Sequence, residues 1–454
     1  MKSVHGYLLL ASLSFVALAA EIDSAAAFDV VLSSQGEYLD AYRTDDVDLN
    51  GNPRRHVLIA PNDPNHGGRH INGQVCFFPN GHGHDGQFVA SDDTYDEVCG
   101  ATDTKDPLAA NYNPRCDPNQ TIYVGNNPPG WVVMNPNGTW SGEVIHAAGC
   151  GPNGQGAPCD VSGISVTNPS SLMDAAGPMA TQGTIDPQGC FFDNAGNLWG
   201  TDVGHDGDPT DHDGSLIVFF ADSGIGKPPY SQYCFVDRVL FSPAMPYYDS
   251  ASEAIYLAES GADHVLKYTG PFPASGADCA VLPDHTATVP PLRTVFTTFP
   301  ADLTLTPAQI VRKLQSDHFY LASVLLLGSV IELDANGVFT GFAAGPYLPN
   351  LSLGGAAILD QGVNPDGLDV GSDGTIYISD LNLQTDPATL RFFSTGCGNL
   401  RRIKNGVTTT ISSLLRFPDG VTVLRGCTEV ACPIDLSALE PATANAGECT
   451  AESH

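Results

Sequence analysis

The stretch GVNPDGLDVGSDGTIYISD at residues 362–380 has the form of a turn, a short strand, a second turn and a second short strand. Gly, Pro, Asp and Asn supply the turns, and the β-branched and aromatic residues between them favour strands. Two further stretches share this layout, INGQVCFFPNGHGHDGQFVASDD at 71–93 and DPQGCFFDNAGNLWGTD at 186–202. Looser copies lie at 244–260 and 308–323. The chain therefore contains an internal repeat, which has to be recognised before its domains are counted.

Each copy is followed by two more runs of β-forming residues, so the repeating unit has four strands. The first strands of four units start near residues 188, 245, 309 and 366, about 57 to 64 residues apart. A sixth unit is split, with FPDGVTVLRG at 417–426 as its first strand and three N-terminal runs as the others. Radial repetition of four-stranded sheets is the architecture of a β-propeller.

We therefore predict an all-β fold, a six-bladed β-propeller of four-stranded antiparallel blades whose last blade is closed by N- and C-terminal strands. The alternative is a seven-bladed propeller in which residues 121–146 form a separate blade. The predicted propeller spans residues 28–426, and a cysteine-containing tail at 427–454 without a strand pattern follows it.

Residues 1–27 have the layout of a secretory signal peptide. Lys2 precedes the apolar run YLLLASLSFVALAA, and small residues place the cleavage after residue 19 or residue 27. No later stretch approaches the roughly 20 apolar residues of a membrane helix. We expect a secreted or periplasmic protein that has no membrane span and is a monomer.

Twelve cysteines agree with an oxidising compartment, where disulfides persist. Their spacings match neither a zinc site nor a c-type haem attachment site. Cys76, Cys190 and Cys397 are open to two interpretations, as disulfide partners or as buried thiols. Local disulfides are plausible for Cys99 with Cys116, Cys150 with Cys159, and Cys427 with either Cys432 or Cys449.

The formal charge of −32 results from 51 acidic residues against 19 basic ones. Nucleic acids and anionic membranes are bound by clustered Lys and Arg, so this composition argues strongly against both as partners. An acidic surface suits cations. The simpler explanation is that the acidic residues keep an exported protein soluble.

The repeats NPDGLDVGSDGTIYISD and DPQGCFFDNAGNLWGTD resemble the blade motif of the NHL-repeat and SMP-30/gluconolactonase/strictosidine-synthase-like propellers. The resemblance implies a six-bladed propeller with a ligand site at one mouth of the central channel. In lactonase-like members, Asn, Asp and Glu side chains hold a divalent cation there, usually calcium. Asp366 matches such a position in type and context, and Asn72 is a reasonable match.

In an up-and-down blade, the start of the first strand and the end of the second strand lie on the same face, so residues at both places should converge on one mouth. Oxygen ligands suit Ca²⁺, and carboxylates crowded at one mouth would repel one another without a cation. The predicted ligands are Asn72, Asp366 and Asp419 at starts of first strands and Glu259, Asp202 and Asp380 at ends of second strands. The alternative is structural: the P-D-G segments are turns in which Gly takes positive φ, and each strand-end acid pins a neighbouring turn.

Three functions follow from this layout. The first is a calcium-dependent hydrolase of lactonase or esterase type acting on a small-molecule or carbohydrate-like ligand, with Asp366, His205 and His70 as catalytic residues. Both histidines are expected at the ligand mouth, and His205 lies in the acidic loop TDVGHDGDPTDHDGS at 201–215, which could bind calcium by itself. The second is a binding propeller in which calcium is only structural. The third, a quinoprotein dehydrogenase, is disfavoured by the scarcity of Lys and Arg.

Overall fold

The computed structural model describes residues 26–35, 38–59, 71–92, 130–147, 186–203, 214–279, 290–299, 306–324, 328–345, 363–385, 392–393, 397–416 and 418–442. Within these ranges the chain is all-β, with short 3₁₀ turns η3 (Ser260–Ala262), η4 (Gly276–Asp278) and η5 (Leu436–Ala438) as its helical segments. In this part of the chain, no helix has the length and apolar character needed to cross a bilayer.

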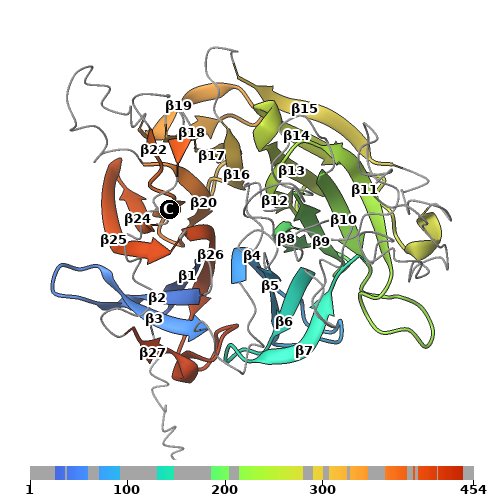
Figure 1. Ribbon diagram of the computed structural model, residues 1–454, viewed down its shortest axis with the longest axis horizontal. Coiled ribbons are helices and arrows are strands. Elements are labelled where there is room, and N and C mark those ends of the chain that lie inside the picture. Colours follow the sequence, from blue (N-terminus) through green and yellow to red (C-terminus); the bar gives the residue numbers. More distant parts are fainter. Residues whose placement is uncertain are drawn as a thin grey trace, which may run out of the picture.

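Small, mostly antiparallel sheets stand around a common centre in a propeller-like ring (Figure 1). Two sheets of four strands come first in the sequence. They are formed by β4 (Ile71–Phe77), β5 (Phe88–Asp92), β6 (Gly130–Met134) and β7 (Trp140–Ile145), and by β8 (Pro187–Phe192), β9 (Leu198–Asp202), β10 (Gly214–Phe219) and β11 (Tyr233–Leu240). Because β6 and β7 complete the sheet that β4 and β5 begin, the alternative that residues 121–146 form a separate blade is wrong.

An eight-stranded sheet follows, in the order β15-β14-β13-β12-β16-β17-β18-β19. Its first half is β12 (Pro243–Asp249), β13 (Ala254–Glu259), β14 (His264–Thr269) and β15 (Leu292–Thr298), and its second half is β16 (Pro307–Arg312), β17 (Phe319–Ser323), β18 (Ser329–Leu333) and β19 (Phe339–Ala344). The halves meet at one parallel residue pair, Met245 of β12 with Gln309 of β16.

The next sheet contains β20 (Pro365–Val370), β21 (Ile376–Asp380), β24 (Cys397–Lys404) and β25 (Val407–Arg416), and a hairpin of β22 (Gln384–Thr385) and β23 (Phe392–Phe393) lies between β21 and β24 in the chain. The last sheet joins the two ends of the chain, as predicted. It runs from β26 (Pro418–Cys427) through β1 (Phe28–Gln35), β2 (Tyr38–Val47) and β3 (Pro53–Ile59) to β27 (Glu440–Pro441). The expectation that the tail lacks a strand is wrong, because β27 pairs with Val57 and His56 of β3.

The first strand of each unit faces the centre, and these inner strands close a ring. β4 contacts β8, β8 contacts β12, β12 contacts β16, β16 contacts β20, β20 contacts β26 and β26 contacts β4. The apolar core lies between neighbouring sheets rather than at the centre. One cluster, for example, combines Trp131 and Val133 with Ile217 and Phe219 of the following sheet, and another joins Val31 and other residues of the last sheet to the sheet that precedes it.

Close approach of neighbouring inner strands explains the repeated P-x-G motif. A Cβ added to Gly367 would lie 2.2 Å from the carbonyl oxygen of Asp419, and one added to Gly420 would lie 1.7 Å from that of Gly73. Neither Gly367 nor Gly420 has positive φ. The interpretation of P-D-G as a turn is therefore wrong: both segments are the first residues of inner strands, and Gly is required because no side chain fits between the backbones.

Disulfides also tie the ring together. Cys76 of β4 is bonded to Cys190 of β8 across a sequence separation of 114, Cys234 is bonded to Cys279, and Cys427 is bonded to Cys432. Cys397 is disulfide-bonded as well. Cys76, Cys190 and Cys397 are thus disulfide partners rather than buried thiols, and Cys432 is the partner of Cys427. Cys99, Cys116, Cys150 and Cys159 lie outside the described residues, as does the predicted signal peptide except for its last two residues.

Candidate functional site

Two carboxyl groups meet at the end of the channel where the inner strands start. Asp366 is the second residue of β20 and Asp419 is the second residue of β26, and their side chains share a hydrogen bond. Asp419 is 2% exposed, whereas Asp366 is only partly buried. The sequence predicted both residues at this mouth, and the structure brings them together.

The pKa of both carboxyl groups in this pair is raised. Burial raises the pKa of Asp366. Burial, followed by the repulsion from Asp366, raises the pKa of Asp419 well above its ordinary value. Two buried carboxyl groups in contact oppose ionisation of both at once, so the pair resists losing its second proton.

A third inner strand joins this site through its backbone. The N–H of Gly73 in β4 donates to Oδ2 of Asp419 over 3.1 Å. Asn72, the residue before it, lies in β4 with its backbone paired to Ser91, and its side chain is outside what the structure describes. His70 and His205 lie outside the described residues, together with most of the acidic loop at 201–215.

The strand-end acids that were predicted as ligands accept hydrogen bonds from neighbouring groups in the structure. Oδ1 of Asp202 accepts the N–H of Asp186 over 3.0 Å, and Oε1 of Glu259 accepts the N–H of Phe241 over 2.6 Å. Oε2 of Glu259 lies 2.5 Å from Nε2 of His264. These bonds match the structural alternative, in which each strand-end acid pins a neighbouring turn.

Asp380 shows the same role most completely. It is buried, and its Oδ1 accepts the N–H groups of Asn364 and Asn382 over 2.8 and 3.0 Å. Its Oδ2 accepts from Nε of Arg401 over 2.6 Å and from Asn399 over 3.0 Å. Across the described ranges, no three His, Cys, Asp or Glu side chains come close enough together to hold a metal ion.

Sequence reasoning missed four hydroxyl groups that link neighbouring inner strands. Thr201 accepts the N–H of Gly189 over 3.0 Å and donates to the carbonyl of Ala244 in the following sheet over 2.9 Å. Ser379 accepts from Gly367 over 2.6 Å and donates to the carbonyl of Asp419. We call this set the hydroxyl relay, and its members are Ser34, Ser91, Thr201 and Ser379.

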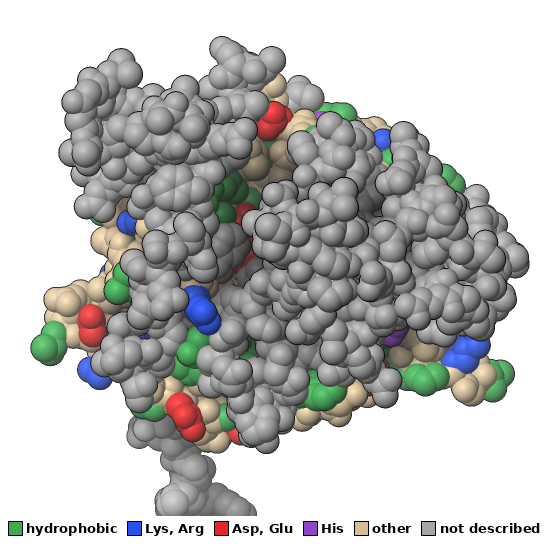
Figure 2. All heavy atoms as spheres, viewed as in Figure 1, with side chains coloured by type: hydrophobic (Ala, Val, Ile, Leu, Met, Phe, Trp, Pro, Cys, Tyr) green, Lys and Arg blue, Asp and Glu red, His purple; other side chains and the backbone are tan. Residues whose placement is uncertain are grey.

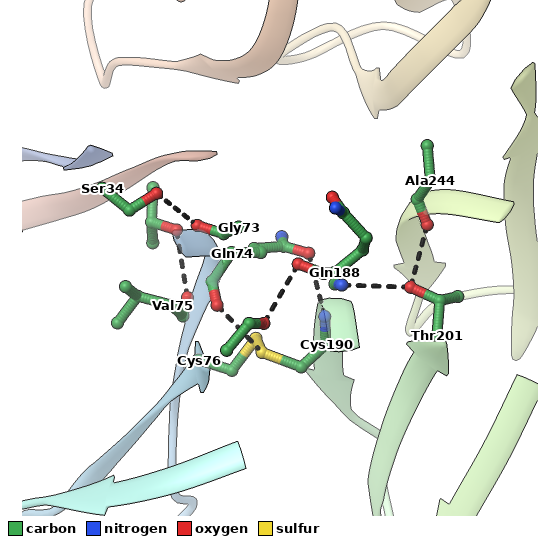
Figure 3. The surroundings of a disulfide bond; sticks show 12 residues. Ser34, Gly73, Gln74, Val75, Cys76, Gln188, Cys190, Thr201 and Ala244 are labelled. Atoms are coloured by element: carbon green, nitrogen blue, oxygen red, sulfur yellow. Dashed lines mark hydrogen bonds between the residues drawn. A yellow bond between two sulfur atoms is a disulfide. The ribbon is translucent and has the colours of Figure 1, made fainter. Parts of the chain in front are cut away.

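Figure 3 shows one section of the relay beside the Cys76–Cys190 disulfide. Ser34 donates to the carbonyl of Gly73, and Thr201 donates to that of Ala244. Gln74 adds a second kind of link, because its Oε1 accepts the N–H of Cys190 over 3.2 Å. Side chains thus satisfy backbone polar groups of neighbouring inner strands.

The space-filling view in Figure 2 shows acidic side chains in the hollow near the centre of the ring.

The hydroxyl relay could have been found from a sequence signal. Ser91, Thr201 and Ser379 each stand directly before an Asp at the end of a second strand. Because the partners of each hydroxyl lie in two different repeats, the repeat alone gives no hint of the contact.

No family model matches the chain, and no curated protein matches it. Three solved structures cover most of it. They are a crystal structure of a nidogen/laminin complex (11% identity, TM-score 0.42, 87% of this chain and 98% of that chain), the luciferin-regenerating enzyme (13%, 0.40, 86% and 96%), and a protein of unknown function from Bacteroides caccae (9%, 0.41, 87% and 98%). The sheet order and the contacts between inner strands define the propeller-like fold.

Proposed function

We propose that this protein is a secreted or periplasmic, calcium-dependent hydrolase of the lactonase or esterase class, acting at the Asp366–Asp419 end of the channel. The observation that carries the proposal is the contact between two carboxyl groups from neighbouring inner strands, one of them 2% exposed. The substrate class is a small-molecule or carbohydrate-like ester or lactone.

The proposal includes a six-bladed architecture of the kind found in NHL-repeat and SMP-30-like propellers. The eight-stranded sheet is held together at its middle by the single parallel pair Met245 and Gln309. A parallel pair of this length is weak beside the antiparallel ladders on either side, so we treat the two halves as separate blades. With the other four sheets they make six.

Two carboxyl groups in contact support the proposal of a hard divalent cation. Asp366 and Asp419 would supply oxygen ligands, the kind that Ca²⁺ prefers. Asn72 follows as a third expected ligand, since its neighbour Gly73 already contacts Asp419. A bound cation would polarise a substrate carbonyl and lower the pKa of a coordinated water.

The residues of the chain have distinct tasks in this scheme. Asp366, the more exposed carboxylate, faces the substrate and accepts a proton from the attacking water. Asp419 keeps Asp366 in position and is itself held by the N–H of Gly73. Ser379 holds the backbone of both strands, because it bonds Gly367 and the carbonyl of Asp419. His70 and His205 are the proposed proton carriers for the leaving group.

One observation favours a second candidate, a non-catalytic binding propeller with a structural cation. Asp419 links β26 to β4, which is the place where the C-terminal strand closes the ring against the first inner strand. A cation that only strengthens this closure would give stability without turnover.

The test is elemental analysis of the full chain before and after treatment with a chelator, combined with hydrolysis of 4-nitrophenyl acetate and dihydrocoumarin. We expect one bound equivalent of calcium, hydrolysis that is lost with the metal, and loss of both in Asp366→Asn. Asp373→Asn, a change to an exposed turn residue of the same sheet, serves as the control. A folded Asp366→Asn variant that retains calcium would overturn the proposal, and calcium without hydrolysis would select the binding propeller.

A further inference from the structure

The opposite end of the channel contains an open cavity of about 850 Å³. It is lined by Gln74, Tyr247, Gln309, Arg312, Asp369 and Arg425 from five inner strands, and by the turn Lys313–Asp317 that follows β16. Inner strands run in the same direction around the ring, so a turn that follows one of them lies at the end opposite the Asp366–Asp419 pair. The cavity is therefore separate from the proposed hydrolytic site.

Two amide side chains present hydrogen-bond donors to this cavity. Gln309 is 1% exposed, and its Oε1 accepts the N–H of Leu368 over 2.5 Å. An N–H requires an acceptor, so this bond fixes the orientation of the amide and leaves the NH₂ group as the free donor. Gln74 is oriented in the same way by the N–H of Cys190. Neither NH₂ group has an acceptor among the residues whose positions are described.

Two guanidinium groups are held at the same cavity by other contacts. Arg312 donates from Nε to the carbonyl of Ser316 over 2.9 Å and from Nη1 to Asp249 over 3.0 Å. Its Nη2 has no acceptor within the described ranges.

Arg425 donates from Nε to the carbonyl of Val370 over 2.5 Å and from Nη2 to Asp369 over 2.6 Å. Its Nη1 also has no acceptor in the described part of the molecule. Both guanidinium groups are therefore fixed in place with a donor still open, which is the arrangement that binds an anionic oxygen group with little loss of side-chain entropy.

Two carboxylates line this cavity, Asp317 and Asp369. Asp369 is engaged by the N–H groups of Val370 and Val423 and by Arg425. Burial raises the pKa of Tyr247 to about 12, so its hydroxyl keeps its proton and can donate. Arg312, Lys313 and Arg425 stand together here, and each is paired with one carboxylate, Asp249, Glu332 and Asp369 respectively.

We propose that this cavity binds a small hydroxylated carboxylate, with the carboxylate at Arg312 and Arg425 and the hydroxyl oxygens at the amides of Gln74 and Gln309. The donors need acceptors, the guanidinium groups select an anion, and the volume lies in the range of small-molecule sites. The inference is independent of the proposed hydrolase, because it uses the other end of the channel and none of the same residues.

The test is isothermal titration calorimetry of the full chain with L-tartrate, which carries two carboxylates and two hydroxyl groups. L-Threitol has the same carbon skeleton without charge, succinate lacks the hydroxyl groups, and inorganic phosphate is a general anion. We expect tartrate to bind with 1:1 stoichiometry, succinate at least about tenfold more weakly, and no detectable binding of threitol. Failure of tartrate to bind, or binding of threitol or phosphate as strong as that of tartrate, would overturn the proposal.

Two variants locate the site. Gln309→Glu keeps the acceptor for Leu368 but replaces the NH₂ donor by a negative charge, and Arg312→Gln removes one guanidinium. Each should weaken tartrate binding at least tenfold. Lys404→Gln changes the net charge equally but lies in an exposed ion pair with Asp373 and should bind like the unmodified protein. Melting curves without ligand show whether each variant is folded, and a folded Arg312→Gln variant with full affinity would also overturn the proposal.

Discussion

The two ends of the channel differ in which hydrogen-bonding group is in excess. At the end where the inner strands start, Asp366 and Asp419 have raised pKa values because two buried carboxyls lie together without a cationic partner among the described residues. At the other end, Gln309 and Arg312 have donors without acceptors among the described residues. The proposed cation site and the proposed anion site therefore lie at opposite ends of the same ring of strands.

The difference depends on how the inner strands are kept apart. Near the Asp366–Asp419 pair, Gly residues let the backbones of neighbouring inner strands approach, and the hydroxyl relay joins them. Toward the cavity, longer side chains such as Gln309 span the gap to the next strand. The links between inner strands thus change from backbone contact at Gly residues to side-chain contact at Gln309.

The largest effect is expected from placing a side chain between two neighbouring inner strands. In Gly420→Ala the new Cβ would lie 1.7 Å from the carbonyl oxygen of Gly73, so β26 could not pack against β4. We expect a loss of more than about 4 kcal/mol in the free energy of unfolding, or no folded protein. Gly51→Ala, with open space around it and only positive φ to accommodate, should cost about 1 kcal/mol. Urea unfolding of both variants measures the difference.

A strand-end acid should matter more to stability than to calcium. Asp380→Ala removes the acceptor for Asn364 and Asn382 and leaves Arg401 without its carboxylate. Loss of one member of a buried pair costs about 3–5 kcal/mol. Calcium content per folded molecule should stay unchanged. A stable Asp380→Ala variant that has lost calcium would show instead that this acid is a ligand.

The hydroxyl relay should contribute a smaller amount. Ser379→Ala leaves the N–H of Gly367 and the carbonyl of Asp419 without their side-chain partner, which costs about 1–3 kcal/mol. Ser379→Thr should retain most of the stability, because Thr201 makes the same two bonds in another sheet. If thermal melting places the Ala and Thr variants together, the hydroxyl makes no contribution.

The smallest effect is the pH dependence of the carboxyl pair. In protein treated with chelator, the pKa of Asp419 is higher in the folded state than in the unfolded chain. The folded state then binds more protons, so this group favours folding at low pH, and its contribution falls as pH rises through the unfolded value and toward the folded one. Asp419→Asn can still donate to Asp366 and accept from Gly73.

Relative to the unmodified protein, Asp419→Asn should therefore gain about 1–2 kcal/mol of stability at pH 8, and the gain should shrink toward pH 4. Urea unfolding at several pH values checks it. A difference that is constant with pH would mean that the carboxyls do not interact in the folded protein.

The positions of the strands could be predicted from the sequence because the pattern that marks a strand is local. Five inner strands begin with a proline, from Pro187 to Pro418, close to the positions predicted from the repeat. The pairing of Cys76 with Cys190 and the contacts of Gln309 could not be predicted, since each joins residues of neighbouring repeats.

Asp366 and Asp380 show the same limit within one motif. Both are acids in the stretch 362–380, and both were predicted as ligands. Asp366 faces a second carboxyl from β26, whereas Asp380 faces Arg401 and two backbone N–H groups. The residue type is the same and both were expected at the same mouth, so the neighbours brought by the fold are needed to tell the surroundings of the two acids apart.

The most direct test of the opposed ends is calorimetric titration of calcium into the chelator-treated unmodified protein, Asp366→Asn and Gln309→Glu. We expect calcium to bind the unmodified protein and Gln309→Glu with equal affinity and not to bind Asp366→Asn. Calcium binding that survives in Asp366→Asn, or that is lost in Gln309→Glu, would contradict it.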